Sequence, residues 1–224
     1  EFAKEIEVVK EERRLRTEDK PTALTFEQFN AVAYRVLPYR NPIIGWMSDL
    51  EQLTADDLRA WYQRWYAPNN AILVVAGDVD PQQVLGLAQK HFGPLQAQDP
   101  PALRESREPE PRGVTRVTVR APARQPYLLM GYKTPVVGQA AEAWEPYALE
   151  VLASVLDGGD SARFSARLVR GSEVASSAGA DYSAYGRLPG MFLIDGTPAE
   201  GQDMAVLEAA LRAEIERLKS ESVE

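Results

Sequence analysis

The sequence contains no cysteine and only one histidine, His91, among its 224 residues. Without cysteine the chain cannot form disulfides, thiolate zinc sites or a cysteine nucleophile. A single histidine excludes any metal site that takes two histidines from this chain, and a Ser-His-Asp triad would have to use His91. Because His91 precedes Phe92 and Gly93 at the end of a predicted helix, we expect it to have a structural role beside the helix dipole.

The sequence also lacks long hydrophobic runs and any excess of positive charge. Its longest apolar stretches, such as AILVVAG at 71–77, are far too short to cross a bilayer. The formal net charge of −8 argues against nucleic acid as the main partner. The first residue is not methionine, and no signal peptide is recognisable. Both ends lie close to helical patterns, so we expect a fragment of a longer protein.

The order of predicted elements indicates an α+β protein, with helices packed on a mainly antiparallel sheet. Residues 1–93 are predicted to form the later part of a first domain. Residues 94–113, rich in proline and charge, are expected to form a linker. Residues 114–224, with the order ββααββα, are predicted to form most of a second domain of similar fold, truncated at its C-terminus.

Local signals define several elements of the first domain. Helices are predicted at 2–19 and 25–38, the second capped by Thr25. Thr54 is predicted to cap the next helix together with Asp57, three residues on, as a capping box. The unbroken apolar run at 71–77 indicates a strand buried on both faces, and a helix with Pro81 in its first turn and Gly93 as C-cap follows. The aromatic residues at helical spacing on the third helix are expected to be core: Trp61, Tyr62 and Trp65.

The second domain is predicted to open with strands at 114–122 and 125–135. Helices are expected at 143–158 and 160–171, strands at 174–185 and 190–198, and a long helix at 201–220. The two later strands are predicted to be neighbours. No glycine pattern matches a phosphate-binding loop, since DGGDSAR at 157–163 lacks the Lys-Ser/Thr pair and follows a helix.

Two glutamates on the first helix raise a question of function. Glu5 and Glu12 are seven residues apart, almost two full turns, and therefore project the same way, with Val8 and Val9 between them. Carboxylates that border an apolar stripe can be partly buried, where they need a partner or a metal. The alternative is a solvated face with Glu–Arg pairs, since Arg13 and other arginines are close. Spacing alone favours this alternative.

Several stretches together resemble the pitrilysin/insulinase-like zinc metallopeptidases, in the branch of mitochondrial processing peptidase and its bacterial relatives. The stretches are EIEVVKEERRLRTED (5–19), NPIIGWMSDLEQLTADDLRAWYQRWYAPNNAILVVAGDVDP (41–81), VLGLAQKHFGPL (84–95) and, more loosely, VLASVLDGGDSARFSARLVRG (151–171). The tract YAPNNAILVVAGDVDP is the most specific of them. The resemblance covers essentially the whole chain.

The resemblance implies roles for both glutamates. In the family the zinc site is an inverted H-x-x-E-H motif, and a glutamate on a later helix is the third ligand. By this resemblance Glu12 is the metal ligand and Glu5 is the supporting carboxylate near the site, which reverses the preference from spacing alone. The H-x-x-E-H motif is absent here and would lie upstream. We therefore expect zinc in the full-length parent, whereas this fragment alone is expected to bind none and to be inactive.

Besides lacking the H-x-x-E-H motif, this sequence departs from the family pattern at residues that bind substrate. Many active members place an Arg, and seven residues later a Tyr, after the helix that corresponds to 160–171. An ungapped alignment puts Val169 and Ser176 at these positions, while Arg170 is one residue off and Tyr182 is too far away. We therefore expect the pair to come from a homologous partner subunit, from a second copy in a homodimer, or from a segment missing from this sequence.

The resemblance thus implies a zinc-dependent endopeptidase acting on peptides or unfolded protein in extended form. The alternative is a non-catalytic scaffold or partner subunit of the same family. The truncated first domain is expected to expose sheet edges and apolar surface. The sequence does not fix the compartment; the bacterial periplasm is the expectation from the family and the lack of cysteine.

Overall fold

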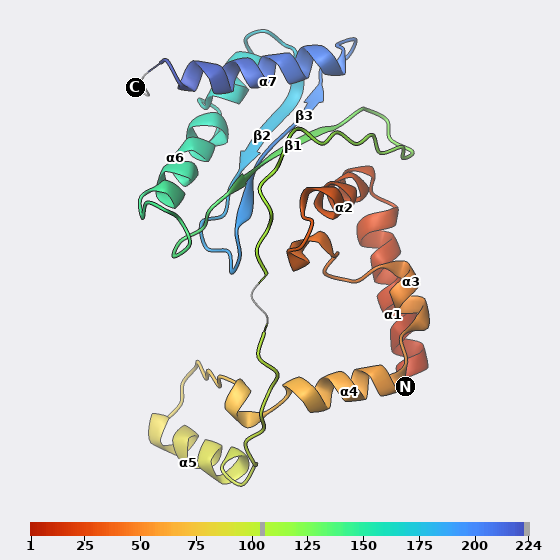
Figure 1. The fold of residues 1–224 in the computed structure, drawn as a ribbon, viewed down its shortest axis with the longest axis vertical. Coiled ribbons are helices and arrows are strands. Elements are labelled where there is room, and N and C mark those ends of the chain that lie inside the picture. Colours follow the sequence, from red (N-terminus) through yellow and green to blue (C-terminus); the bar gives the residue numbers. More distant parts are fainter. Residues whose placement is uncertain (104–105, 222–224) are drawn as a thin grey trace. The chain divides into compact units, whose positions relative to one another are not determined.

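The computed structural model describes residues 1–103 and 106–221 (Figure 1). The chain divides into two compact units. Unit 1 comprises Glu1–Arg13 and Ile43–Arg107. Unit 2 comprises Arg14–Pro42 and Glu108–Glu224. Helices and a small antiparallel sheet are both present, which confirms the α+β prediction.

The regular elements of unit 1 are helical in the residues that the structure describes. They are α1 (Phe2–Arg13), α3 (Met47–Gln52), α4 (Ala55–Trp65), a 3-10 turn η3 (Pro68–Asn70) and α5 (Pro81–Phe92). The capping box before α4 is confirmed: the Thr54 hydroxyl accepts from the Asp57 N–H at 3.2 Å, and the Asp57 carboxylate accepts from the Thr54 N–H at 3.0 Å. Local polar chemistry therefore sets where this helix begins.

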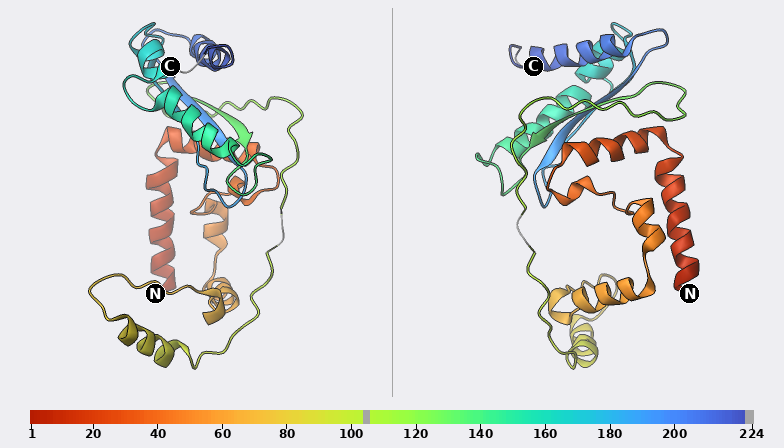
Figure 2. Two further views of the ribbon diagram at one scale, coloured as in Figure 1. Left: turned by 90° about the vertical axis from the view of Figure 1, so that its left-hand side faces the viewer. Right: turned by 45° about the vertical axis from the view of Figure 1, so that its right-hand side comes forward.

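Two predictions for unit 1 are wrong. Residues 71–77 form no strand. They are an irregular segment between α4 and α5 (Figure 2), in which Val74 is 80% exposed. The aromatic stripe is not core either, since Trp61 and Tyr62 are both more than half exposed and Trp65 is only half-buried. A strand becomes buried only against partner strands and a layer that covers them. Among the described residues of unit 1 there is no such strand, so the apolar run and the aromatic face stay uncovered.

Unit 2 contains a three-stranded antiparallel sheet with helices around it. The strands are β1 (Leu128–Thr134), β2 (Ala175–Asp181) and β3 (Gly190–Pro198), in the order β1-β3-β2. The helical elements are η1 (Arg14–Glu18) and η4 (Phe164–Val169), both π-helical, the 3-10 turn η2 (Pro38–Arg40), α2 (Pro21–Ala33), α6 (Glu145–Asp157) and α7 (Met204–Leu218). Gly179 pairs with Asp195, so the predicted pairing of the two later strands is confirmed.

Two further predictions are corrected in unit 2. Thr25 does not cap a helix, because α2 begins at Pro21, whose fixed φ suits a first helical position. The Thr25 hydroxyl instead donates to the Pro21 carbonyl at 2.8 Å within the helix. Residues 114–122 form no strand. Arg116 in this segment binds Glu208 on α7 through two hydrogen bonds of 2.8 and 2.9 Å, which hold it on that helix instead.

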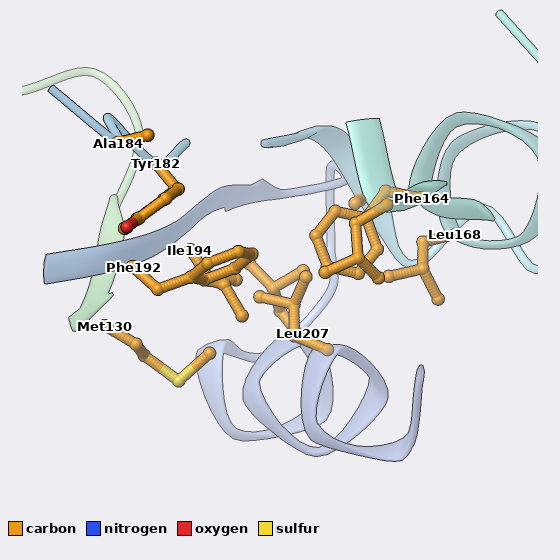
Figure 3. Close-up of a cluster of buried hydrophobic side chains, with 11 residues drawn as sticks. Met130, Phe164, Leu168, Tyr182, Ala184, Phe192, Ile194 and Leu207 are labelled. Carbon is orange, nitrogen blue, oxygen red and sulfur yellow. The ribbon is translucent and has the colours of Figure 1, made fainter. Parts of the chain in front are cut away.

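The core of unit 2 lies between one face of the sheet and the helices α6 and α7. Phe192 and Ile194 alternate with outward residues on β3 and point toward Leu207 of α7 (Figure 3). Phe164 of η4 closes the same cluster and is completely buried. Burial of a side chain of this kind contributes roughly 1.5–3 kcal/mol. This cluster is the main hydrophobic stabilisation of unit 2.

Helix α2 packs against the opposite face of the sheet. Gly131 on β1 lies so close to the ring of Phe29 that an added Cβ would overlap it, and the sulfur of Met191 is next to the same point. Sequence patterns placed this helix in the first domain, whereas it groups with unit 2. The domain limits at residues 93 and 114 stay a prediction.

A glutamate clasp, defined here as Glu108 with its four donors, ties residues 35–37 to the start of the second segment of unit 2. The Glu108 carboxylate accepts from the N–H groups of Arg35, Val36 and Leu37 at 2.7, 3.0 and 3.1 Å, and from the Lys133 ammonium at 2.8 Å. Burial alone would raise the pKa of Glu108, but Lys133 and the three amides outweigh it and lower that pKa to about 2. The clasp is therefore ionised throughout the neutral range.

Candidate metal-ligating helix

Helix α1 carries both predicted site residues on one uninterrupted helix (Figure 2). The seven residues from Glu5 to Glu12 advance the helix by about 10 Å and almost two turns, so both side chains project on the same side. Glu5 is exposed to solvent, whereas Glu12 is half-buried. The structure thus places the two glutamates on one helical face but gives them different environments.

The partly buried stripe beside these glutamates ends in a charged residue. Phe2, Ile6 and Val9 are half-buried, and the same spacing next reaches Arg13. Val8, on the side of the glutamates, is 60% exposed. The inner side of α1 is therefore the line from Phe2 to Arg13, and Glu12 lies at its border.

Arg13 is the residue of this site that sequence reasoning missed. Its side chain was considered only as a partner for surface carboxylates, yet it is just 4% exposed. Its Nη1 donates to the carbonyl of Gly45 at 2.8 Å, and its guanidinium carbon lies 5.9 Å from the ring centroid of Trp46. A signal was available, because Arg13 continues the apolar spacing of Phe2, Ile6 and Val9.

The loop that contacts Arg13 has a well-defined backbone conformation. Gly45 has φ +88°, a left-handed conformation that favours glycine. The carbonyl of Trp46 accepts the N–H groups of Asp49 and Leu50, both at 3.0 Å, and so begins α3. Leu50 is buried and reaches back toward Gly45. Arg13 consequently joins α1 to a compact loop and helix.

The solvated-face alternative describes part of α1. Lys10 and Glu7 form an ion pair at 2.8 Å on the surface, three residues apart. Such a pair contributes only about 0.3–0.5 kcal/mol. Surface pairing therefore accounts for Glu7 and Lys10, whereas Arg13 belongs to the interior.

The described residues hold part of a zinc site at most. Among them, no group of three or more His, Asp or Glu side chains lies close enough together to hold a metal ion. His91, in the last turn of α5, is exposed. The half-buried carboxylate of Glu12 suits a hard or borderline cation as one ligand. A site with three protein ligands would therefore need residues outside the described set.

The residues aligned with the family's substrate-holding pair do not resemble it chemically. Val169 packs against the core of unit 2. The hydroxyl of Ser176 donates to the carbonyls of Thr197 and Pro198, both at 3.3 Å. Neither side chain provides a cation or a phenol.

Arg170 and Tyr182, the nearest Arg and Tyr in the sequence, form hydrogen bonds within unit 2. Arg170 donates to the backbone carbonyl of Asp160. Tyr182 is buried, and its hydroxyl donates to the Pro135 carbonyl at 2.6 Å. Both side chains thus serve the fold of unit 2.

An acidic hollow lies between α6 and β2, with a volume of about 440 Å³ and a lining that includes Glu150, Asp157 and Asp181. Asp195 on β3 lies close to it across Gly179, against which Asp157 also sits. Burial is the largest cause that raises the pKa of Asp195; a hydrogen bond from Tyr127 opposes it, and the charges of Asp157 and Asp181 add to it. The carboxylates here repel one another without forming a metal-binding group.

Comparison with known proteins places this geometry in a wider context. A family model described as Peptidase M16 inactive domain matches residues 52–224. The zinc protease PqqE of Helicobacter pylori is 34% identical over 181 residues, which cover 80% of this chain and 40% of that protein. The chain therefore spans about two fifths of the length of this curated relative.

Solved structures agree with that match. A protease from Helicobacter pylori superposes with a TM-score of 0.86 at 30% identity, covering 100% of this chain and 54% of the other. The periplasmic protease PqqL from Escherichia coli has a TM-score of 0.69 at 19% identity, covering 98% of this chain and 24% of that one, and so shares the fold. Both units thus have counterparts in larger proteases.

Proposed function

This chain belongs to the peptidase M16 family of zinc metallopeptidases, and from that premise we propose that it is part of a zinc-dependent endopeptidase and supplies one of its metal ligands. The proposed substrates are peptides or unfolded protein segments in extended form, whose peptide bonds are hydrolysed. The observation that carries the proposal is the position of Glu12, half-buried on α1 and two turns after Glu5.

Each glutamate has a proposed role. Glu12 offers its carboxylate as the third ligand, and Glu5 adds negative charge on the same face as the supporting carboxylate. Zinc bound by this glutamate and two histidines would supply Lewis-acid chemistry: it would activate a water molecule and polarise the peptide carbonyl. The sequence has one histidine and no H-x-x-E-H motif, so both histidine ligands are proposed to come from outside this chain. We propose that the chain alone is inactive.

A partner is part of the proposal. An ungapped alignment puts Val169 and Ser176 at the positions of the substrate-holding pair. The neighbouring Arg170 and Tyr182 donate to backbone carbonyls within unit 2. A homologous subunit, or a second copy, would then supply an Arg and a Tyr toward the substrate. Co-purification of the full-length protein with a homologue, or a dimer in solution, is the expected result; full activity from an isolated monomer would contradict it.

The second candidate function is a non-catalytic scaffold or partner subunit of the same family. The same missing pair favours it, since a subunit that holds no substrate needs neither residue. The two candidates predict different metal contents for the full-length protein: zinc is present in a peptidase and absent from a scaffold.

The bacterial periplasm is the proposed location. Its support is the Escherichia coli protease PqqL, which shares the fold and is described as periplasmic. In the described residues, 1–103 and 106–221, no helix combines the length and hydrophobicity that a membrane span requires.

Replacement of the proposed ligand tests the function directly. In the full-length protein, Glu12→Gln should weaken zinc binding at least about 100-fold, because even outer-shell partners of a metal typically account for about 10–100-fold. Peptidase activity should fall with it. Zinc content and chelator competition are the measurements. Glu11→Gln, on the exposed side of α1, is the matched control and should bind zinc normally.

The possible outcomes separate the two candidates. A Glu12→Gln protein that keeps its zinc would show that another residue is the ligand. A full-length wild-type protein that contains no zinc and cleaves no peptide would instead identify the scaffold function.

A further inference from the structure

The geometry points to Arg13 as a positioning residue that fixes the direction in which Glu12 leaves α1; this inference rests on the proposed role of Glu12 as a metal ligand. Arg13 immediately follows Glu12 and is the last residue of α1. Successive residues of an α-helix are separated by about 100° around its axis. A contact that fixes the azimuth of Arg13 therefore fixes the azimuth of Glu12 as well.

The contacts of Arg13 are of the kind that resist rotation. A buried guanidinium needs hydrogen-bond partners, and the Gly45 carbonyl at 2.8 Å is one of them. The planar group also lies over the ring of Trp46, at 5.9 Å. A rotation of α1 that moved Glu12 would break both contacts and leave a charge in a site that is only 4% exposed.

The receiving loop is itself anchored. Gly45 occupies a left-handed conformation, and Trp46 begins α3, whose Leu50 is buried beneath the turn. Because Arg13 contacts this loop, the position of α3 constrains the orientation of the last turn of α1. The role proposed for Arg13 is positional, since its Nη1 donates to the loop at the Gly45 carbonyl.

Arginine suits this role better than the residues that could replace it. Lysine could donate to the Gly45 carbonyl but cannot stack as a plane on Trp46. Methionine could fill the space, but it has neither the charge nor a donor. The two replacements therefore separate the hydrogen bond from the packing.

Zinc affinity of the full-length protein gives the first test, with zinc itself as the probe in chelator competition. Arg13→Met should weaken zinc binding by about tenfold or more, in the range of lost outer-shell support. Arg13→Lys should recover part of that loss. Arg59→Gln is the control, since the exposed Arg59 pairs with Asp56 of its own helix and its replacement should leave zinc affinity unchanged. Wild-type affinity in Arg13→Met would overturn the inference.

A metal-independent test uses the absence of cysteine from this chain. Spin labels on cysteines introduced at Glu12 and at the exposed Ser48 of α3 report the distance between the two helices by pulsed electron paramagnetic resonance. Arg13→Met should broaden or shift that distribution, and Arg59→Gln should not. An unchanged distribution would overturn the inference even if Arg13→Met binds zinc poorly.

The two tests also distinguish the inference from the proposed function. If Glu12→Gln retains zinc, the ligand assignment fails, and a shifted spin-label distribution in Arg13→Met would then show that Arg13 anchors α1 without a role in metal binding. If Glu12→Gln loses zinc and Arg13→Met keeps it, the ligand assignment stands and only the positioning role is wrong.

Discussion

Asp195 lies on β3 among groups that disfavour its negative charge. Burial raises its pKa first, the hydrogen bond from Tyr127 acts against that, and Asp157 and Asp181 raise it further. Because the folded-state pKa is above the unfolded value, the folded state binds the proton more tightly. Stability from this group is therefore present below the unfolded pKa and is lost as the pH rises through the folded pKa.

We predict that Asp195→Asn stabilises the chain at pH 7, because asparagine removes the disfavoured charge and can still accept from Tyr127. The gain in melting temperature should shrink as the pH falls toward the unfolded pKa of aspartate, about 3.9. Thermal unfolding at several pH values measures it. Asp160→Asn, at an exposed position, is the control; a loss of stability in Asp195→Asn at pH 7 would refute the prediction.

At the same scale, the sequence allowed one half of the candidate site to be predicted. The spacing of Glu5 and Glu12 on one helix is a local property that the structure reproduces. Arg13 could not be recognised as interior from charge alone, because its burial depends on Gly45 and Trp46, more than thirty residues away. Such a contact is visible only when the loop conformation is known.

The elements differ in how well local sequence determines them. The start of α4 follows from Thr54 and Asp57, and the helix α5 from Asp80 and Pro81, because capping groups act within a few residues. The strands expected at 71–77 and 114–122 failed for a different reason. A strand is stabilised by its neighbours, and neither stretch has a paired neighbour in the described structure.

The glutamate clasp should make the stability of unit 2 depend on pH. The pKa of Glu108 falls from 4.5 to about 2 on folding. A lowered folded-state pKa contributes stability that is fully present above the unfolded value and is lost as the pH falls from about 4.5 to about 2. Glu108→Gln should therefore destabilise unit 2 at pH 7 and differ less from wild type near pH 2.

Urea unfolding at pH 7, 4 and 2.5 checks this prediction. The matched control is Glu110→Gln, two residues on, which is exposed. A difference between Glu108→Gln and wild type that stays constant over this range would show that ionisation of Glu108 is not what the clasp depends on.

At the scale of unit 2 as a whole, the contact between α2 and the sheet joins two distant segments. Gly131→Ala should destabilise unit 2 by about 1–3 kcal/mol, because the added methyl group overlaps Phe29 and presses on Met191. Denaturant unfolding measures the change. Gly190→Ala on β3, where an added Cβ meets nothing within 4 Å, should have little effect. Equal stabilities of the two variants would contradict this packing.

The contact of Phe29 with Gly131 also has a consequence for folding during synthesis. Helix α2 leaves the ribosome about a hundred residues before β1, and longer still before β3. At about 5–20 residues per second, roughly 5–20 s pass before its apolar face can meet the sheet. During that interval the apolar face of α2 is open to chaperones or to other chains, so the order of translation exposes this helix to aggregation before the sheet exists.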